Sequence, residues 1–269
     1  MITLYVLGSG SRGNCFAVES DGMALLIDAG FSAREIERRA VSAGLDLRLV
    51  AGIALTHEHG DHACGAARLA RILRVPVLTA PGTWARLGID NLDAEHRALG
   101  FCSRVEVGAF SIEACATSHD AAEPIAMVIR GSDGTSIGLA YDLGRPTRAL
   151  RYLLRGVHAL VLEANHDEVQ LRTSDYPPVV QQRIAGSTGH LSNRAAAELL
   201  AELHHPGLGA VVLAHLSEHC NTALDARTTV ARALRRAGFR GALHVADQDR
   251  PLAPILVVQR GGIQLALAL

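Results

Sequence analysis

Apolar residues along the chain occur in short runs that polar turn residues separate, a pattern typical of strands. Three runs near the N-terminus, at Thr3–Leu7, Phe16–Glu19 and Met23–Asp28, predict three strands. The sequence Ser20-Asp21-Gly22 joins the last two and predicts a hairpin turn.

A helix is predicted from Ser32 to Ala43. Ser32 is a good N-cap, Glu35 completes a capping-box pattern, and Gly44 marks the C-terminal end. The pattern then predicts a strand, a helix and a strand, at Ile53–Thr56, Cys64–Leu73 and Val75–Thr79.

The rest of the chain continues this alternation. Strands are predicted at Ser111–Ala116, Ile125–Arg130, Ser136–Tyr141, Ala159–Glu163, Gly209–Ala214 and Ala242–Val245. Helices are predicted from Pro146, which suits a first helical turn, to Arg155, and at Asn193–His205 and Ala223–Ala237. A Pro-containing loop is expected between Glu163 and Asn193.

Both halves of the chain begin with strands and end in helix–strand alternation, without strict βαβ regularity. This order favours an α+β fold in which helices flank two mixed β-sheets. The length of 269 residues fits one large domain or two fused halves. Because no long linker or repeat interrupts the pattern, we expect a single domain, residues 1–269.

Composition excludes several classes of protein. With 49% hydrophobic residues, 20% charged residues and a formal net charge of −1, the chain is neither disordered nor fibrous. Its longest apolar runs, such as Ala159–Leu162 and Ala210–Ala214, are too short to cross a bilayer. Because residues 1–8 lack a basic leader and the five cysteines form no CxxC pair, we expect a cytoplasmic protein without a disulfide framework.

All 26 basic residues are arginine. Arginine binds phosphate in bidentate fashion, which suits a nucleic-acid substrate. A codon bias toward arginine explains the same composition more simply, so composition alone identifies no partner.

Residues 8–13, Gly-Ser-Gly-Ser-Arg-Gly, match the GxGxxG dinucleotide-binding pattern. That motif requires a helix directly afterwards, whose N-terminus faces the pyrophosphate. Here residues 15–19 form another strand pattern, which excludes a Rossmann site. The segment is better interpreted as a tight turn between strands, where the backbone can approach a ligand.

Four potential metal ligands, His57, His59, Asp61 and His62, directly follow the strand at Ile53–Thr56. Imidazole and carboxylate groups together suit zinc, manganese or iron, whereas closed structural sites more often use cysteine. Four ligands so close in sequence cannot all bind one ion. The spacing therefore allows His57 and His59 to share one ion while Asp61 and His62 turn toward a second.

Each ion then needs ligands from elsewhere in the chain. His119, Asp142 and His215 all follow predicted apolar strands. Functional residues of open α/β sheets lie at such strand ends, so these three are the candidates.

The HxHxDH motif at residues 57–62, followed in order by His119, Asp142 and His215, resembles the metallo-β-lactamase superfamily. The resemblance implies a four-layer αββα sandwich with two divalent ions, Zn²⁺ or Mn²⁺, at one edge of the sheets. It also implies that Asp142 bridges the ions and that Asp28 orients a ligand. The implied ligands are His57, His59 and His119 for one ion and Asp61, His62 and His215 for the other.

Residues 8–14, 162–167 and 189–193 are similar to the YycJ/WalJ-like branch of bacterial exonuclease-type proteins. The resemblance implies a phosphodiesterase, a 5′–3′ exonuclease type acting on DNA in preference to RNA, that uses a metal-bridging hydroxide. The alternatives are a small-molecule hydrolase for an ester, thioester or lactone, and a binding module that keeps the fold without the chemistry. The complete ligand set argues against the binding module.

The residues expected to take part in catalysis are His190, Asp61 and Glu163. His190 precedes a predicted helix start that favours anions, so it is a candidate proton donor or phosphate contact. Glu163 ends a buried strand, where it either orients His190 or a metal ligand or pairs with an arginine. Further candidates for substrate contact are Ser192, Asn193, Arg12 and Asn14, although Asn14 also suits turn formation.

The nuclease and small-molecule hypotheses differ in the surroundings of the ions. A nuclease should place arginines in a positive channel, and a small-molecule enzyme should have a closed pocket. Glu58, inside the motif, is expected to face away from the ions. The arginines expected in the channel are Arg12, Arg145, Arg172, Arg183 and Arg194.

Overall fold

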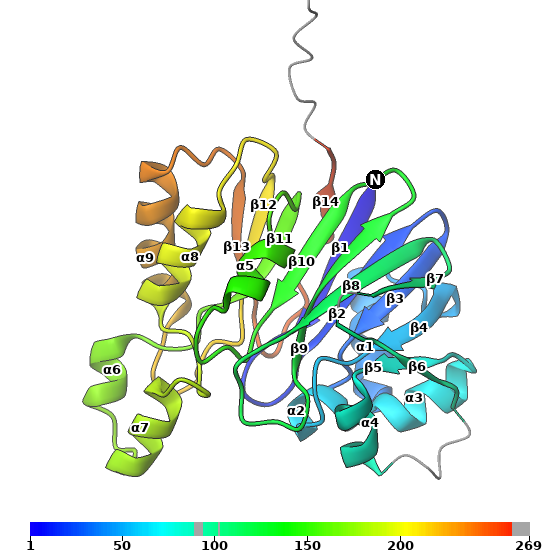
Figure 1. Ribbon diagram of the computed structural model, residues 1–269, viewed down its shortest axis with the longest axis horizontal. Coiled ribbons are helices and arrows are strands. Elements are labelled where there is room, and N and C mark those ends of the chain that lie inside the picture. Colours follow the sequence, from blue (N-terminus) through cyan, green and yellow to red (C-terminus); the bar gives the residue numbers. More distant parts are fainter. Residues whose placement is uncertain (89–93, 102, 260–269) are drawn as a thin grey trace, which may run out of the picture.

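A computed structural model describes residues 1–88, 94–101 and 103–259. Two seven-stranded sheets pack face to face, with helices on both outer surfaces (Figure 1). The first sheet has the order β14-β1-β2-β3-β4-β5-β6 and the second β13-β12-β11-β10-β9-β8-β7. The predicted α+β sandwich of four layers is therefore confirmed.

Most strands form where the apolar runs predict them. The strands of the first sheet are β1 (Ile2–Gly8), β2 (Cys15–Ser20), β3 (Met23–Ile27), β4 (Val50–Ala54), β5 (Val77–Thr79), β6 (His96–Ala98) and β14 (Ile255–Val257). Those of the second are β7 (Arg104–Val107), β8 (Phe110–Ala116), β9 (Ile125–Gly131), β10 (Ser136–Ala140), β11 (Ala159–Glu163), β12 (Ala210–Ala214) and β13 (Ala242–Val245).

The helices lie outside the sheets. They are α1 (Ala33–Ala43), α2 (Gly60–Ala63), α3 (Ala66–Leu73), α4 (Pro81–Leu87), α5 (Arg148–Leu153), α6 (Glu168–Arg172), α7 (Pro178–Ala185), α8 (Asn193–Leu203) and α9 (Ala223–Arg236), with a short 3₁₀ turn at Leu47–Leu49. Among the described residues, no helix combines the length and apolar character needed to cross a membrane.

Three layers of apolar contact hold the sandwich together. The central core lies between the sheets and includes Phe16, Phe110 and Tyr141. A second core joins the outer face of the first sheet to α1 and α3, and a third joins the second sheet to α5, α8 and α9. Both sheets are buried on both faces, which explains their nearly continuous apolar strands.

The signals predicted at the ends of α1 are present. Ser32 Oγ accepts a hydrogen bond from the backbone N–H of Glu35, and Gly44 ends the helix with a φ of 78°. The Glu35 carboxylate takes a different role from the predicted capping box, because it accepts hydrogen bonds from Arg38 and Arg39.

Other helix predictions need correction. The helix predicted over Cys64–Leu73 begins two residues later, as α3 at Ala66, and the short helix α2 that precedes it was not predicted. Gly65 lies between the two helices, and its N–H bonds to the carbonyl of Ala29. The predicted start at Pro146 is wrong, because α5 begins at Arg148 with Thr147 as its N-cap. The stretch between Glu163 and Asn193, expected as a loop, contains α6 and α7.

Parallel strands determine where the site can form. Strands β3 to β6 run parallel in the first sheet, and β10 to β13 run parallel in the second. The carboxyl ends of parallel strands meet at one edge of a sheet, so the residues after β3, β4, β10, β11 and β12 gather there. These residues include most of the candidate ligands.

Candidate metal centre

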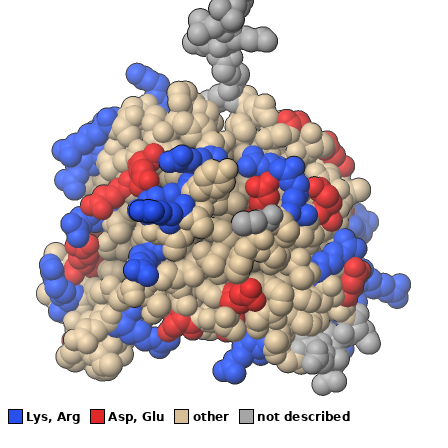
Figure 2. All heavy atoms as spheres, viewed as in Figure 1, with Lys and Arg blue, Asp and Glu red and all other residues tan. Residues whose placement is uncertain are grey.

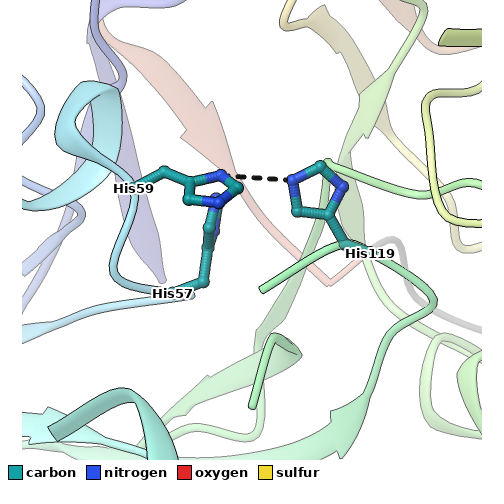
Figure 3. A group of neighbouring side chains, drawn as sticks. All are labelled: His57, His59 and His119. Carbon is teal, nitrogen blue, oxygen red and sulfur yellow. Dashed lines mark hydrogen bonds between the residues drawn. The ribbon is translucent and has the colours of Figure 1, made fainter. Parts of the chain in front are cut away.

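The loop between β4 and α2 brings His57 and His59 beside His119, which lies in the loop between β8 and β9. The three rings converge (Figure 3), with ligand atoms within 4.8 Å of one another and His119 Nε2 at 3.4 Å from His59 Nδ1. Atoms bound to one tetrahedral ion at about 2.0 Å lie roughly 3.3 Å apart. The spacing therefore fits three ligands of a single ion.

A second group contains Asp61, His62 and His215. The Oδ2 atom of Asp61 lies 3.2 Å from His62 Nε2 and 3.5 Å from His215 Nε2. Asp61 and His62 belong to α2, whereas His215 follows β12 of the other sheet. This group joins the two sheets at their common edge.

Asp142, which follows β10, lies between the two groups. Its Oδ2 atom is 3.0 Å from His62 Nε2 and 3.9 Å from His57 Nε2, and its Oδ1 atom is 3.9 Å from His119 Nε2. The residue is 2% exposed, so its carboxylate faces the histidines rather than solvent. This is the position required of a bridging carboxylate, although the assignment of ligands to particular ions stays a prediction.

Asp28 fixes the orientation of the His62 ring. Its carboxylate accepts hydrogen bonds from His62 Nδ1 at 2.7 Å, from the Tyr141 hydroxyl at 2.8 Å and from the backbone N–H of Thr56 at 2.8 Å. All four residues are buried. Because Nδ1 is bonded to Asp28, Nε2 is the atom that His62 presents to the cleft.

Glu163, at the end of β11, performs the same task for two histidines. Its Oε1 atom lies 2.8 Å from His190 Nδ1 and 3.1 Å from His215 Nδ1. Its Oε2 atom accepts from the backbone N–H groups of Leu143 and Leu191. Glu163 is fully buried, so it positions side chains and does not itself line the cleft.

Burial and neighbouring charges set opposite protonation states across the site. Burial lowers the pKa of His57 and of His119, which favours the neutral, metal-binding form. Burial also acts to lower the pKa of His190, but the Glu163 and Asp142 carboxylates together outweigh it and raise this pKa to about 10. For His215, burial again acts to lower the pKa, but Asp142, Asp61 and Glu163 together raise it to about 9.

The residues present fit divalent cations. His57 Nε2, His215 Nε2 and Asp142 Oδ2 are buried atoms without a hydrogen-bond partner, and all three point into the ligand groups. Unpartnered buried polar atoms are rare and need an explanation, and a metal ion would supply their missing partner. The cluster can therefore hold divalent metal.

A cleft of about 280 Å³ opens onto these groups. His190 lines this cleft, and its side chain is 21% exposed. The other lining residues of the metal groups are His59, Asp61, His119, Asp142 and His215. Along with them the cleft is lined by Ser11, Asp120, Asn165, Tyr176, Val180, Arg183, Ile184, Gly189 and Ser217.

Two of the residues predicted to contact substrate are buried behind the site. Asn14 is fully buried, bonds to Ser9 and Gly10, and lies 3.2 Å from His62 Nε2. Asn193 is 2% exposed and forms a reciprocal amide pair with Asn221. Both side chains are therefore buried, and their contact with a substrate stays a prediction that this burial does not support.

The other two predicted contacts lie beside the cleft. Ser192 is the N-cap of α8, and its hydroxyl donates to Glu168. Arg12 is exposed but paired with Asp249 and, at 3.5 Å, with Glu218. Neither residue lines the cleft beside the histidines.

Of the five arginines predicted for a positive channel, only Arg183 lines the cleft beside the histidines. Arg12 and Arg194 are ion-paired, and Arg183 lines the cleft but binds Asp120. On the face in Figure 2, basic and acidic side chains are interspersed over the described surface. Arg172 lines a neighbouring cavity, and Arg145 is exposed.

Glu58 faces away from the cluster, as predicted. Its Oε1 atom accepts a hydrogen bond at 2.8 Å from the backbone N–H of Ala122. Glu58 thus ties the metal-binding loop to the loop that carries His119. The supporting residues Thr56 and Tyr141 were not predicted, because each stands next to a candidate ligand and carries no signal of its own.

Comparisons with known proteins agree with this geometry. A family model described as "Beta-lactamase superfamily domain" matches residues 24–216. The chain belongs to the metallo-β-lactamase superfamily. It is 34% identical over 237 residues to exodeoxyribonuclease YycJ of Bacillus anthracis, covering 87% of this chain and 89% of that protein.

A further relative and a solved structure are also similar to the chain. Exodeoxyribonuclease WalJ of Streptococcus pneumoniae is 29% identical over 237 residues, covering 86% of this chain and 88% of that protein. The metallo-β-lactamase fold protein YhfI from Bacillus subtilis has a TM-score of 0.70 at 16% identity, covering 94% of this chain and 99% of that one. The chain is therefore a hydrolase of this fold, similar to the YycJ and WalJ branch.

Proposed function

We propose that this protein is a metal-dependent exonuclease that hydrolyses phosphodiester bonds of DNA. The observation that carries the proposal is the position of Asp142 between two groups of three ligands, in a chain 34% identical to an exodeoxyribonuclease. Both groups open onto one cleft, as a two-ion site requires.

The proposed ligands divide as the geometry groups them. His57, His59 and His119 would hold one Zn²⁺ or Mn²⁺ ion and Asp61, His62 and His215 the other, with Asp142 shared. When bound, such ions supply Lewis acidity toward a phosphate oxygen and lower the pKa of water. The protein's own part is to fix the ligands, through Asp28 and Glu163, before substrate arrives.

His190 is the proposed phosphate contact and proton donor. Glu163 binds its Nδ1 atom at 2.8 Å, which leaves Nε2 to meet the substrate. Because its pKa is raised to about 10, the ring is protonated at neutral pH. A protonated His190 can bind a phosphate oxygen and donate its Nε2 proton to the oxygen that leaves.

The test is cleavage of DNA and RNA strands labelled at the 5′ or 3′ end, with Zn²⁺ or Mn²⁺ added to metal-stripped protein. We expect metal-dependent release of nucleotides from one end of DNA, faster than from RNA. His190→Asn should reduce the rate by about 10²- to 10⁴-fold while bound metal stays unchanged.

Two results would contradict the proposal. One is the absence of DNA cleavage with every metal while a small ester or lactone is hydrolysed. The other is a full rate of DNA cleavage in protein that a chelator has freed of metal.

A further inference from the structure

One wall of the cleft comes from the segment that carries α6 and α7, which projects from the second sheet at the lower left of Figure 1. Tyr176, Val180, Arg183 and Ile184 of this segment line the cleft together with the histidines. Val180 and Ile184 lie four residues apart on α7 and so share one face of the helix. Tyr176 precedes the helix and lines the same cleft, so the three residues form an apolar stripe along it.

This stripe is not part of a hydrophobic core. None of the residues of α7 is buried, and Tyr176, Val180 and Ile184 are all partly exposed. Polar contacts hold the segment in place: Arg183 binds Asp120, and Ser118 Oγ donates to the carbonyl of Ser187 at 2.6 Å. An apolar stripe that faces a polar cleft is therefore available to a ligand.

The backbone around Tyr176 is held before any ligand binds. Pro177 follows it and restricts its backbone to an extended conformation, and Pro178 starts α7. Gln181 Nε2 donates to the Tyr176 carbonyl at 2.9 Å. The ring itself lies edge-to-face with His219, at 5.8 Å between centroids.

We propose that Tyr176, Val180 and Ile184 form a nucleobase-binding subsite, on which the unpaired base at the end of a DNA strand stacks. The subsite rests on the proposed function, in which His190 and the ions that the ligands would hold bind the phosphate. An aromatic ring with apolar neighbours binds the face of every base, so the subsite is tolerant of sequence. It favours a strand end over an internal position.

The size of the cleft supports an unpaired nucleotide. A volume of about 280 Å³ is just below the usual range of small-ligand pockets, so the cleft suits one nucleotide better than a base pair with its two backbones. Enzymes that act in such a recess take single-stranded nucleic acid or extrude a nucleotide from the duplex. The proposed substrate end is therefore single-stranded or frayed.

The test uses metal-loaded protein and a single DNA strand that carries the fluorescent base 2-aminopurine at its terminal position. Terminal phosphorothioate linkages slow its hydrolysis during the binding measurement. Stacking on Tyr176 should quench the fluorescence with wild-type protein and with Tyr176→Phe, but not with Tyr176→Ala. Val179→Ala is the matched control, because Val179 is on the same helix, is 71% exposed and does not line the cleft.

Kinetics provide the second readout. Tyr176→Ala should raise KM for single-stranded DNA by about 5- to 150-fold with little change in kcat, the range that one base–aromatic stack supplies. A strand with an abasic terminal nucleotide should show the same loss with wild-type protein and no further loss with Tyr176→Ala. If the loss from removing the Tyr176 ring and the loss from removing the terminal base do not add, the ring and the base interact with each other.

The same quenching and the same KM in Tyr176→Ala and Val179→Ala would overturn the subsite. If both variants still cleave DNA in that case, the proposed exonuclease stands. Quenching by Tyr176 without any DNA cleavage would support the subsite and overturn the exonuclease. Additive losses from the abasic strand and Tyr176→Ala would also overturn the subsite.

Discussion

At the scale of single residues, Asp28, Asp142 and His215 share a backbone conformation that side chains rarely adopt. Their φ angles are 57°, 56° and 54°, and each lies at or just after the end of a parallel strand. Such left-handed residues cost on the order of 1 kcal/mol or more each. At these positions the turn directs a carboxylate or imidazole into the site, so strain and function coincide.

The sequence predicted the ligands of the site better than their supports. Histidine and aspartate at HxHxDH spacing are informative because few other roles place them so close together. Tyr141 and Thr56 act through Asp28, and only the folded chain shows which polar groups surround that carboxylate. The burial of Asn14 and Asn193 was not predicted, because sequence does not reveal which side of a loop is buried.

Asp28→Asn tests the support of His62. The substitution places an amide N–H among the donors of His62 and Tyr141, so His62 loses its fixed orientation. We expect metal affinity to fall by about 10- to 100-fold, measured by competition with a chelator. Asp21→Asn, in an exposed turn, is the control, and equal metal affinity in Asp28→Asn and wild type would refute the positioning role.

At the scale of elements, prediction succeeded for segments whose buried apolar residues follow a regular pattern in the sequence. The strands β11 and β13 were predicted with the bounds that the structure has. Helix α7 was missed because none of its residues is buried and its eight residues carry too few apolar positions to establish a helical period. The strands β6 and β14 have three residues each, too few to show alternation.

Helix α1 offers a test at this scale because Arg39, which forms an ion pair within the helix, also connects it to β1 and to the segment after β13. Arg39 is buried, donates to Glu35, and reaches the carbonyls of Leu7 and Gln248. Hydrogen bonds from Arg38, followed by those from Arg39, lower the pKa of Glu35 to about 2. The ionised carboxylate is therefore favoured in the folded state.

Glu35→Gln should lower the free energy of unfolding at pH 7 by about 1 kcal/mol. Because folding lowers the pKa of Glu35, its contribution is complete above about pH 4.5 and is lost as the pH falls toward 2. Urea unfolding of metal-free protein between pH 7 and pH 3 measures the difference. Glu37→Gln, exposed on the same helix, is the control, and a difference that stays constant with pH would count against this ion pair.

At the scale of the whole molecule, the site exists only where the two sheets meet. His57, His59, Asp61 and His62 come from the first sheet's edge, and the distant ligands come from the second. The order of the ligands along the sequence, which resembles that of the superfamily, was sufficient to predict that ligands from the two sheets lie together at one edge. The wall formed by α6 and α7 could not be predicted, because its place depends on contacts such as Arg183 with Asp120.

The central claim, that the cluster binds two ions with Asp142 between them, is tested most directly by counting bound metal. Elemental analysis of reconstituted protein should find about two ions per chain in wild type and in Glu58→Gln, whose carboxylate faces away. Asp142→Ala should retain one ion or none, because it removes the shared ligand. Equal metal content in Asp142→Ala and wild type, or a single ion in wild type, would contradict the account.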